Sequence, residues 1–510
     1  MRIKTGSAVG PALVRSLEPM LRAVAGCAGP QGRRCLYDDG GTVSRALTAL
    51  EIVRQVAETR DSDGAAALIV RETLFDADRE LGDGGARLAL LLATLFREGI
   101  RLIAAGVPAP ALADALLALG PAFDAALVAA KHTGTGEPTL SAVAASAGAS
   151  PLLATDIARL LTAVGTDGHA EIVASLGPGQ RLESGTGFIF EAREAAKIFS
   201  SAEFDPVHLL VADEIIDDFG PLVPLLEGFA TRGKSLLVVA RDVTGTALQI
   251  LIQNRKENGL RTAALKPTAV AQQAADNLED LAIATGATLV ADRFGTSIKA
   301  LRPNMLGRAA RFSFSHGRAL LEAPAGAGAA IEARRRLLMA EADRQKYLSL
   351  DKERLERRAT RLSGRWARLH LGAATDRETD TLLAEARRAL ASARMALTGG
   401  AVEGGGIGMV RAFDRLQALD ETGVLSPELA ARRCLALGLA ELVHSFAACA
   451  SKDARPRLSL KSAASLQRTL GIAGKASPGP LDPLQLVRAI SRRAISGAAT
   501  LLRVEVILGR

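Results

Sequence analysis

Leu236-Leu237-Val238-Val239 is a short apolar run that follows Gly233-Lys234 and precedes a helix-length amphipathic stretch. Three runs of the same kind lie nearby, and they are Leu209-Leu210-Val211, Thr262-Ala263-Ala264-Leu265 and Thr288-Leu289-Val290. Short apolar runs separated by amphipathic helices are typical of buried strands in an α/β domain. The sequence therefore predicts an α/β domain between residues 209 and 314.

The sequence on both sides of this domain has the pattern of helices. Ala and Leu recur at helical spacing over residues 11–119, and a charged run with sparse leucines covers 331–365. Helical periodicity is again present from residue 376, and residues 503–508 alternate between polar and apolar side chains as a strand does. The predicted fold class is mainly α with an inserted α/β domain, and 510 residues suggest two to four domains.

Composition excludes several classes of function. Aromatic residues make up only 3%, so base stacking on aromatic platforms is disfavoured, and 63 basic against 55 acidic residues is a mild excess. We expect no specific nucleic-acid partner. The four cysteines form no C-x-x-C pair and the six histidines are scattered, so the spacing of a zinc site is missing. Buried, reduced thiols in a cytoplasmic protein are expected.

Hydropathy predicts no membrane partner. The longest mostly apolar run, Leu88 to Phe96, is far short of the about 20 residues that a spanning helix needs. The amino terminus is broken by Gly6, Gly10 and Pro11, so no continuous apolar signal core is formed. We therefore expect a mature cytoplasmic chain.

Residues 228–235 match the phosphate-loop pattern G-x-x-x-x-G-K-S. A true phosphate loop follows a strand and opens a helix, so that backbone donors meet the phosphate. Here a plausible helix start at Pro221 and Pro224 precedes the pattern, and the strand-like apolar run from Leu236 to Ala240 follows it. A helix that ends at Gly233 with a solvated Lys234 is the favoured interpretation.

Two other glycine clusters have two interpretations each. Gly82-Asp83-Gly84-Gly85 could place a carboxylate on a metal or form a turn with an Asp cap, and the turn is favoured when the cluster is taken alone. Gly404-Gly405-Gly406 could bring backbone close to a ligand or act as a flexible link, and the link is favoured when it is taken alone. No hydrolase motif is present, and the histidines receive no role.

Eight short strings occur in a familiar order along nearly the whole chain. They are Gly29-Pro30-Gln31-Gly32-Arg33, Gly82-Asp83-Gly84, Ala104-Ala105-Gly106, Val164-Gly165, Arg241-Asp242-Val243-Thr244-Gly245, Gly372-Ala373-Ala374-Thr375, Gly404-Gly405-Gly406 and Leu481-Asp482-Pro483. In this order the sequence resembles the group I chaperonin family of GroEL type. The resemblance implies a three-domain subunit: equatorial (1–129 and 399–510), intermediate (130–189 and 366–398) and apical (190–365).

The resemblance implies a nucleotide pocket in the equatorial domain for ATP with Mg²⁺ and K⁺. The matching positions that keep the family's residues are Gly29, Pro30, Asp83, Gly84, Gly405 and Asp482, of which Asp83 is the implied metal ligand. Other positions depart from the family. The loop's Thr-Leu reads Cys27-Ala28, the K-D-G segment aligns best to Arg45-Ala46-Leu47, and three threonines read Gly85-Ala86-Arg87.

The departure at Arg388 matters most. The family's water-positioning carboxylate falls on Arg388, which can pair with phosphate but cannot accept a proton. A one-residue slip of register reaches only Arg387. Arg87 adds a cation that could replace the metal or block the pocket. We expect weak or absent ATP hydrolysis.

The resemblance also implies a polypeptide-binding surface in the apical domain. The matching apolar positions are Val223, Leu226, Leu248 and Ile252, with Gln253 at a usually apolar place. On periodicity alone these four would be ordinary core residues of amphipathic helices. With the resemblance, surface exposure and capture of unfolded or partner polypeptides are expected.

The predicted function is that of a chaperonin-like binding protein, assembled into rings or partial rings, with an impaired ATPase. Two alternatives remain: an active ATP-driven foldase in which Glu385 or Asp380 supplies the lost carboxylate, and a binding subunit of a mixed ring with an ordinary chaperonin. Ring contacts are in doubt because the stretch 33–52 is several residues shorter than the family's hairpin. The sequence does not indicate the client, the ring size or a co-chaperonin.

Overall fold

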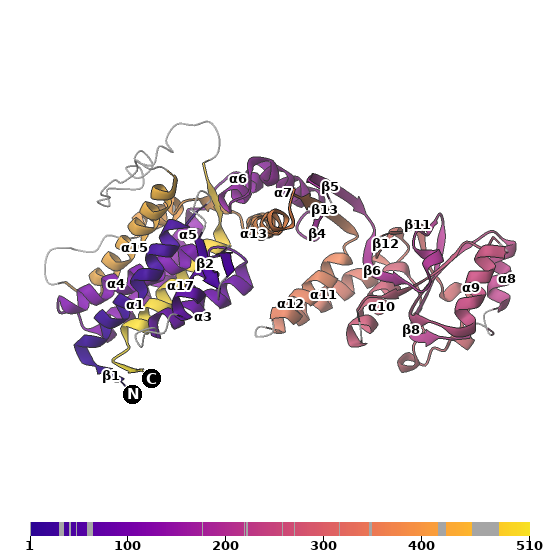
Figure 1. The fold of residues 1–510 in the computed structure, drawn as a ribbon, viewed down its shortest axis with the longest axis horizontal. Coiled ribbons are helices and arrows are strands. Elements are labelled where there is room, and N and C mark those ends of the chain that lie inside the picture. Colours follow the sequence, from indigo (N-terminus) through magenta and orange to yellow (C-terminus); the bar gives the residue numbers. More distant parts are fainter. Residues whose placement is uncertain are drawn as a thin grey trace. The chain divides into compact units, whose positions relative to one another are not determined.

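A computed structural model describes most of the 510 residues (Figure 1). The described ranges are 2–29, 35–39, 42–46, 48–58, 65–175, 177–218, 220, 223–257, 259–269, 271–315, 317–345, 349–416, 425–450 and 479–509. The chain divides into two compact units. The first comprises residues 1–162, 172–182 and 369–510, and the second comprises 163–171 and 183–368.

The second unit is built on a seven-stranded sheet. Its strands are β6 (Phe188–Glu194), β7 (Glu203–Phe204), β8 (Val207–Ile216), β9 (Ser235–Val243), β10 (Thr262–Pro267), β11 (Gly307–Ser315) and β12 (Arg318–Pro324). Their order is β12-β6-β10-β9-β8-β11-β7, and β12 also pairs with β11. The three central strands β8, β9 and β10 are parallel. Parallel strands require crossovers, which α8 (Val223–Thr231) and α9 (Gly245–Glu257) supply.

The strand predictions are confirmed for three of the four apolar runs. Residues 209–211, 236–239 and 262–265 lie within β8, β9 and β10, and most of these side chains are fully buried. The run at 288–290 forms no strand of its own, because only Val290 makes an isolated parallel bridge to Ala212. The charged run is helical as predicted, as α11 (Gly328–Arg344) and α12 (Ser349–Arg361) after α10 (Ala271–Thr285).

The first unit is mainly helical. Its helices are α1 (Val9–Gly26), α2 (Ala49–Glu58), α3 (Ala65–Leu81), α4 (Gly85–Ala104), α5 (Ala109–Ala129), α6 (Glu137–Ser146), α7 (Pro151–Val164), α13 (Asp376–Gly399), α14 (Ile407–Asp414), α15 (Pro427–Ala450) and α17 (Leu484–Leu502). Helix α4 is its central element. It is buried almost all round between α1, α15 and α17, which explains why Ala and Leu occur on nearly every side of this helix.

Short strands complete the first unit. A hairpin joins β2 (Cys35–Asp39) to β3 (Thr42–Ala46), and β14 (Ala401–Glu403) pairs with β15 (Leu481–Pro483). Near the two chain ends, β1 (Arg2–Thr5) pairs antiparallel with β16 (Val506–Gly509), which confirms the alternating pattern near the carboxyl end. A three-stranded sheet has the order β4 (His169–Ala174), β13 (Arg365–Gly372) and β5 (Gly179–Thr186), and the residues of its strands are divided between the two units.

Helix α5 is the one described helix with the length and apolar composition that a membrane crossing would need. Its mean hydropathy is 1.6, and 33% of that window is buried. A single helix of this kind is weak support for a span, because core helices meet the same criterion. Here Leu112, Leu116, Phe123 and Leu127 are fully buried in the helical core.

Candidate nucleotide-binding site

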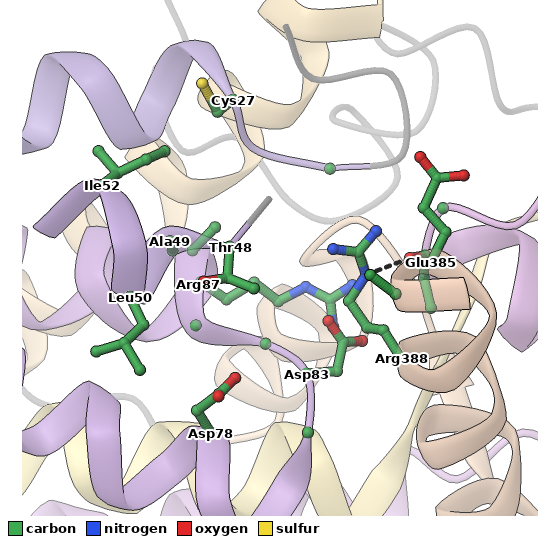
Figure 2. Close-up of a pocket in the computed structure, with 18 of the residues that line it drawn as sticks. Cys27, Thr48, Ala49, Leu50, Ile52, Asp78, Asp83, Arg87, Glu385 and Arg388 are labelled. Atoms are coloured by element: carbon green, nitrogen blue, oxygen red, sulfur yellow. Dashed lines mark hydrogen bonds between the residues drawn. The ribbon is translucent and has the colours of Figure 1, made fainter. Parts of the chain in front are cut away.

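A cavity of about 530 Å³ lies within the first unit (Figure 2). Its walls come from the end of α1, the β3–α2 connection, the α3–α4 turn, the end of α6, and one face of α13. Phe446 of α15 also lines it. Segments that are more than 300 residues apart in sequence therefore meet at this cavity.

The α3–α4 turn forms one wall. Gly82 and Gly84 adopt left-handed conformations, with φ of 65° and 84°, which a side chain would strain. A Cβ on Gly84 would also press on Ile490 and Leu486. The favoured turn interpretation is confirmed, but Asp83 caps nothing: Gly84 is the N-cap residue of α4, and Asp83 Oδ2 accepts a hydrogen bond from Ser392 Oγ at 2.6 Å.

Arg87 extends from the first turn of α4 into this cavity. Its side chain is only 9% exposed, and Nη2 lies 2.6 Å from Asp482 Oδ1. Nη1 is buried and has no hydrogen-bond partner among the described residues. The guanidinium carbon lies 5.5 Å from the centre of the Phe446 ring. In Figure 2 Arg87 reaches toward Asp83 and Arg388.

Asp482 lies on β15, directly behind Arg87. It is 2% exposed, and burial raises the pKa of its carboxyl group while the Arg87 guanidinium and the Gly405 backbone oppose that rise. Gly405 and Gly406 have φ of 67° and 85° and lead from β14 into α14. The glycine string therefore forms a tight turn with a left-handed backbone between β14 and α14.

Helix α13 supplies the opposite wall. Its start is set by Thr375, whose hydroxyl accepts a hydrogen bond from the Glu378 backbone N–H at 3.3 Å. Arg388 Nε donates to the carbonyl of Ala147 at 3.0 Å. A Cβ on Gly148 would lie 3.2 Å from Arg388 Nη2, so the glycine leaves room for this guanidinium.

Acidic groups are also present at the cavity. Asp78, Asp83 and Glu385 line it together with Arg87, Arg387 and Arg388. The pKa of Asp78 is raised by burial and by the carboxylates of Glu51 and Asp83, and Arg388 opposes this rise. The cavity therefore balances three carboxyl groups against three guanidinium groups.

The predicted nucleotide-binding residues meet only in part. Gly29, Asp83 and Gly84 line the cavity. Gly405 and Asp482 do not line the cavity: Asp482 contacts the lining residue Arg87, and the Gly405 backbone bonds to Asp482. Pro30 lies outside the described residues. Arg388 lies on the cavity wall, as its alignment predicts. Asp78, Ser392 and Phe446 were not predicted, because none belongs to a motif or a glycine turn.

The residues around Asp83 do not fit a magnesium ion. Mg²⁺ prefers a shell of oxygen ligands. Asp83 instead has the Ser392 hydroxyl and the guanidiniums of Arg87 and Arg388 near it. Within the part of the chain that the structure describes, no three His, Cys, Asp or Glu side chains are placed so that they could hold a metal ion together. An anion fits this donor set better, because guanidinium groups pair with phosphate.

The phosphate-loop match in the second unit is a helix end, as predicted. Helix α8 ends at Thr231, Gly233 has φ of 60°, and β9 begins at Ser235. The N–H of Lys234 donates to the Phe229 carbonyl at 3.0 Å, which closes the helix. Its ammonium lies 5.9 Å from the Phe229 ring centre.

The four apolar positions of the second unit differ in exposure. Val223 is 37% exposed at the start of α8, but Leu226 is 4% exposed and belongs to the core. The expected exposure of Leu226 is therefore wrong, because this side of α8 packs onto the sheet. Leu248 and Ile252 on α9 are half-buried against the same core. Their binding role stays a prediction.

The thiols also depart from expectation. Cys434 is buried, and burial together with the Glu98 carboxylate raises its pKa to about 12. Cys27 and Cys35 are only half-buried, since both lie at chain segments beside the cavity or on the hairpin. Within the described part of the chain, none of these three thiols forms a disulfide. The side chain of Cys449 lies outside the described residues.

Solved structures of other proteins share this architecture. No family model matches the chain. The fold is that of a chaperonin subunit: the whole chain superposes on solved chaperonin structures, and the predicted fold class and the resemblance to chaperonins are confirmed at the level of fold.

One solved structure with this fold is that of the chaperonin gp146 from the bacteriophage EL 2 (Pseudomonas aeruginosa), crystallised in presence of ATP-BeFx. Crystal form I gives a TM-score of 0.63 at 18% identity over 100% of this chain and 99% of that chain. Crystal form II gives 0.57 at 15% identity over 100% of both chains.

Proposed function

We propose that this chain is a chaperonin-like protein that binds non-native or partner polypeptides through its second unit. In this proposal ATP binds in the cavity of the first unit and is hydrolysed slowly or not at all. The chaperonin fold over the whole chain supports the polypeptide-binding part. The cavity beside Gly29, Asp83 and Gly84, and the ATP-BeFx present with the phage chaperonin, support the nucleotide part.

The loss of hydrolysis rests on one observation: Arg388 stands on the cavity wall where the resemblance implies the water-positioning carboxylate. A guanidinium cannot accept a proton and is cationic at every accessible pH, so it cannot orient or activate an attacking water as a carboxylate does. The hydroxyls that the family places after Asp83 are also missing, since residues 85–87 read Gly-Ala-Arg.

The proposed binding residues follow from the same comparison of sequence and geometry. For nucleotide they are Gly29, Pro30, Asp83, Gly84, Gly405 and Asp482. For polypeptide they are Val223, Leu248 and Ile252, with Leu226 beneath them as core. We further propose the division into equatorial, intermediate and apical domains, a cytoplasmic location, and self-association into rings or mixed rings.

Steady-state ATP turnover by the purified protein tests the proposal. We expect a rate at least on the order of a hundredfold below that of an ordinary chaperonin, the lower end of what a positioned acid or base contributes. Arg388→Asp is expected to raise the rate. Arg377→Asp, exposed on the same helix and not among the residues that line the cavity, is the matched control and is expected to leave the rate unchanged. A wild-type rate near that of an ordinary chaperonin would contradict the proposal.

The second candidate is an active ATP-driven foldase. Glu385 favours it, because this carboxylate lines the cavity three residues before Arg388, whereas Asp380 is exposed and does not line it. Under this alternative the wild type turns over ATP and Glu385→Gln abolishes turnover with nucleotide affinity kept. Size analysis of the protein, alone and mixed with an ordinary chaperonin, separates a self-assembling subunit from a mixed-ring subunit.

A further inference from the structure

One donor at the cavity has no acceptor among the residues that the structure describes. Arg87 is 8% exposed as a residue, its Nη2 is held by Asp482, and its Nη1 is buried without a hydrogen-bond partner from those residues. A buried donor left without an acceptor is unfavourable, and such groups in native proteins mark an ion, a water or a ligand. Arg87 is one of the residues that line the cavity, so a ligand lies beside this side chain, and a small turn of the guanidinium toward the ligand would bring the unused edge of the fork to its oxygen.

The groups nearest to this donor favour an anion as that ligand, while the carboxyl groups of Asp78 and Glu385 also line the cavity. Arg87 belongs to the first turn of α4, where the free backbone N–H groups and the helix dipole favour negative charge. Arg388 reaches the same region from α13, as Figure 2 shows. The carboxylate of Asp83 is engaged by the Ser392 hydroxyl, and that of Asp482 is neutralised by Arg87 itself.

We propose that the cavity receives phosphate oxygens directly on the guanidinium of Arg87, with Arg388 as the second cation, and that nucleotide binds without a divalent metal ion. The inference rests on the proposed nucleotide function of this cavity and gives its phosphate subsite a chemistry. Asp482 acts here as a positioning residue: it holds one edge of the Arg87 fork and leaves the other for the ligand. Asp83 is not a metal ligand in this arrangement.

Charge explains why the metal becomes unnecessary. A divalent ion in a triphosphate site neutralises phosphate charge and fixes its geometry, and two guanidinium groups can do both because their planar forks match phosphate oxygens. The positive charges of Arg87 and Arg388 also repel a Mg²⁺ ion beside Asp83. Nucleotide affinity is therefore expected to be the same with and without Mg²⁺.

Calorimetric titration of the full-length protein tests this directly. ATP is titrated once in excess EDTA and once in MgCl₂, and we expect dissociation constants that agree within about twofold. Inorganic tripolyphosphate, which has no base or ribose, is expected to displace ATP in EDTA. ATP binding that requires Mg²⁺ would overturn the inference and leave the proposed nucleotide function standing. No ATP binding in either buffer would reject the proposed nucleotide site itself.

A variant then assigns the effect to Arg87. Arg87→Lys keeps a cation beside the buried Asp482 but loses the second edge of the fork, so metal-free ATP affinity is expected to fall on the order of tenfold or more. Arg101→Lys, on the same helix with its side chain 69% exposed, is the matched control and should leave affinity unchanged. Unchanged affinity in a folded Arg87→Lys protein would overturn the role of Arg87. If that variant fails to fold, the wild-type comparison of EDTA with MgCl₂ still decides.

Discussion

Capture of a polypeptide and stability of the second unit should be separable on helix α8. Leu226 and Val223 lie three residues apart, but Leu226 is 4% exposed and Val223 is 37% exposed. Truncating Leu226 to Ala opens a cavity in the core that includes Phe229 and the sheet. Changing Val223 to Ser removes apolar surface that already faces solvent. The two substitutions therefore perturb neighbouring positions through different physical terms.

The magnitudes follow from burial. A buried Leu→Ala change costs about 2–5 kcal/mol, and in a unit of this size each kcal/mol lowers the unfolding midpoint by about 2–4 °C. Val223→Ser is expected to change stability by less than about 0.5 kcal/mol. If a client covers the exposed third of Val223, its loss weakens capture by up to about 1 kcal/mol, roughly fivefold.

Thermal unfolding and the fluorescence anisotropy of a labelled, chemically unfolded protein measure the two effects. We expect Leu226→Ala to lower the midpoint and leave capture per folded molecule unchanged, and Val223→Ser to do the reverse. The pair Leu248→Ser with Ile252→Ser is expected to affect both, because these side chains are half-buried against the core. A Val223→Ser protein that melts as early as Leu226→Ala, with capture unchanged, would refute the reasoning.

Two further predictions concern the rest of the chain. Arg488 donates two hydrogen bonds to Asp124 at 2.8 and 2.7 Å, which together with Arg492 lowers the pKa of Asp124 from 3.8 to about 2. The lowered pKa means that this stabilisation is complete above about pH 4 and disappears as pH falls through 2. Asp124→Asn should thus cost about 1–2 kcal/mol by urea unfolding at pH 7 and nothing below pH 2. Lys234→Ala should leave ATP affinity unchanged, because Lys234 closes a helix in the second unit, and loss of binding would revive the phosphate-loop interpretation.

The sequence predicted elements best where burial is complete. Strands β8 to β10 are covered on both faces, so their residues form short, continuous apolar runs. The run at 288–290 has the same appearance, yet it forms only one bridge at Val290. A run of three apolar residues does not show whether the tertiary structure brings an unpaired strand beside it for backbone hydrogen bonding.

The site was predictable only where a motif marks it. Glycine turns that need a left-handed backbone leave a visible pattern, which is how Gly84 and Asp83 could be placed before the structure. Phe446 and Ser392 reach the cavity from the middle of long helices, and nothing in helical periodicity separates them from ordinary packing positions. The burial of Leu226 could not be predicted for a related reason: periodicity identifies an apolar face, but what covers that face depends on the tertiary structure.

The charges in the cavity bear on what bound nucleotide could do. A ligand shifts a conformational equilibrium only by its differential affinity for the two states, and it can do so without being consumed. Hydrolysis adds direction, because it removes the ligand and resets the equilibrium. If phosphate binds on Arg87 and Arg388 while no carboxylate positions the water, the nucleotide acts as an effector that holds one state. Capture of polypeptide would then depend on ATP concentration and would be matched by a non-hydrolysable analogue, whereas an active foldase would release its client only with hydrolysable ATP.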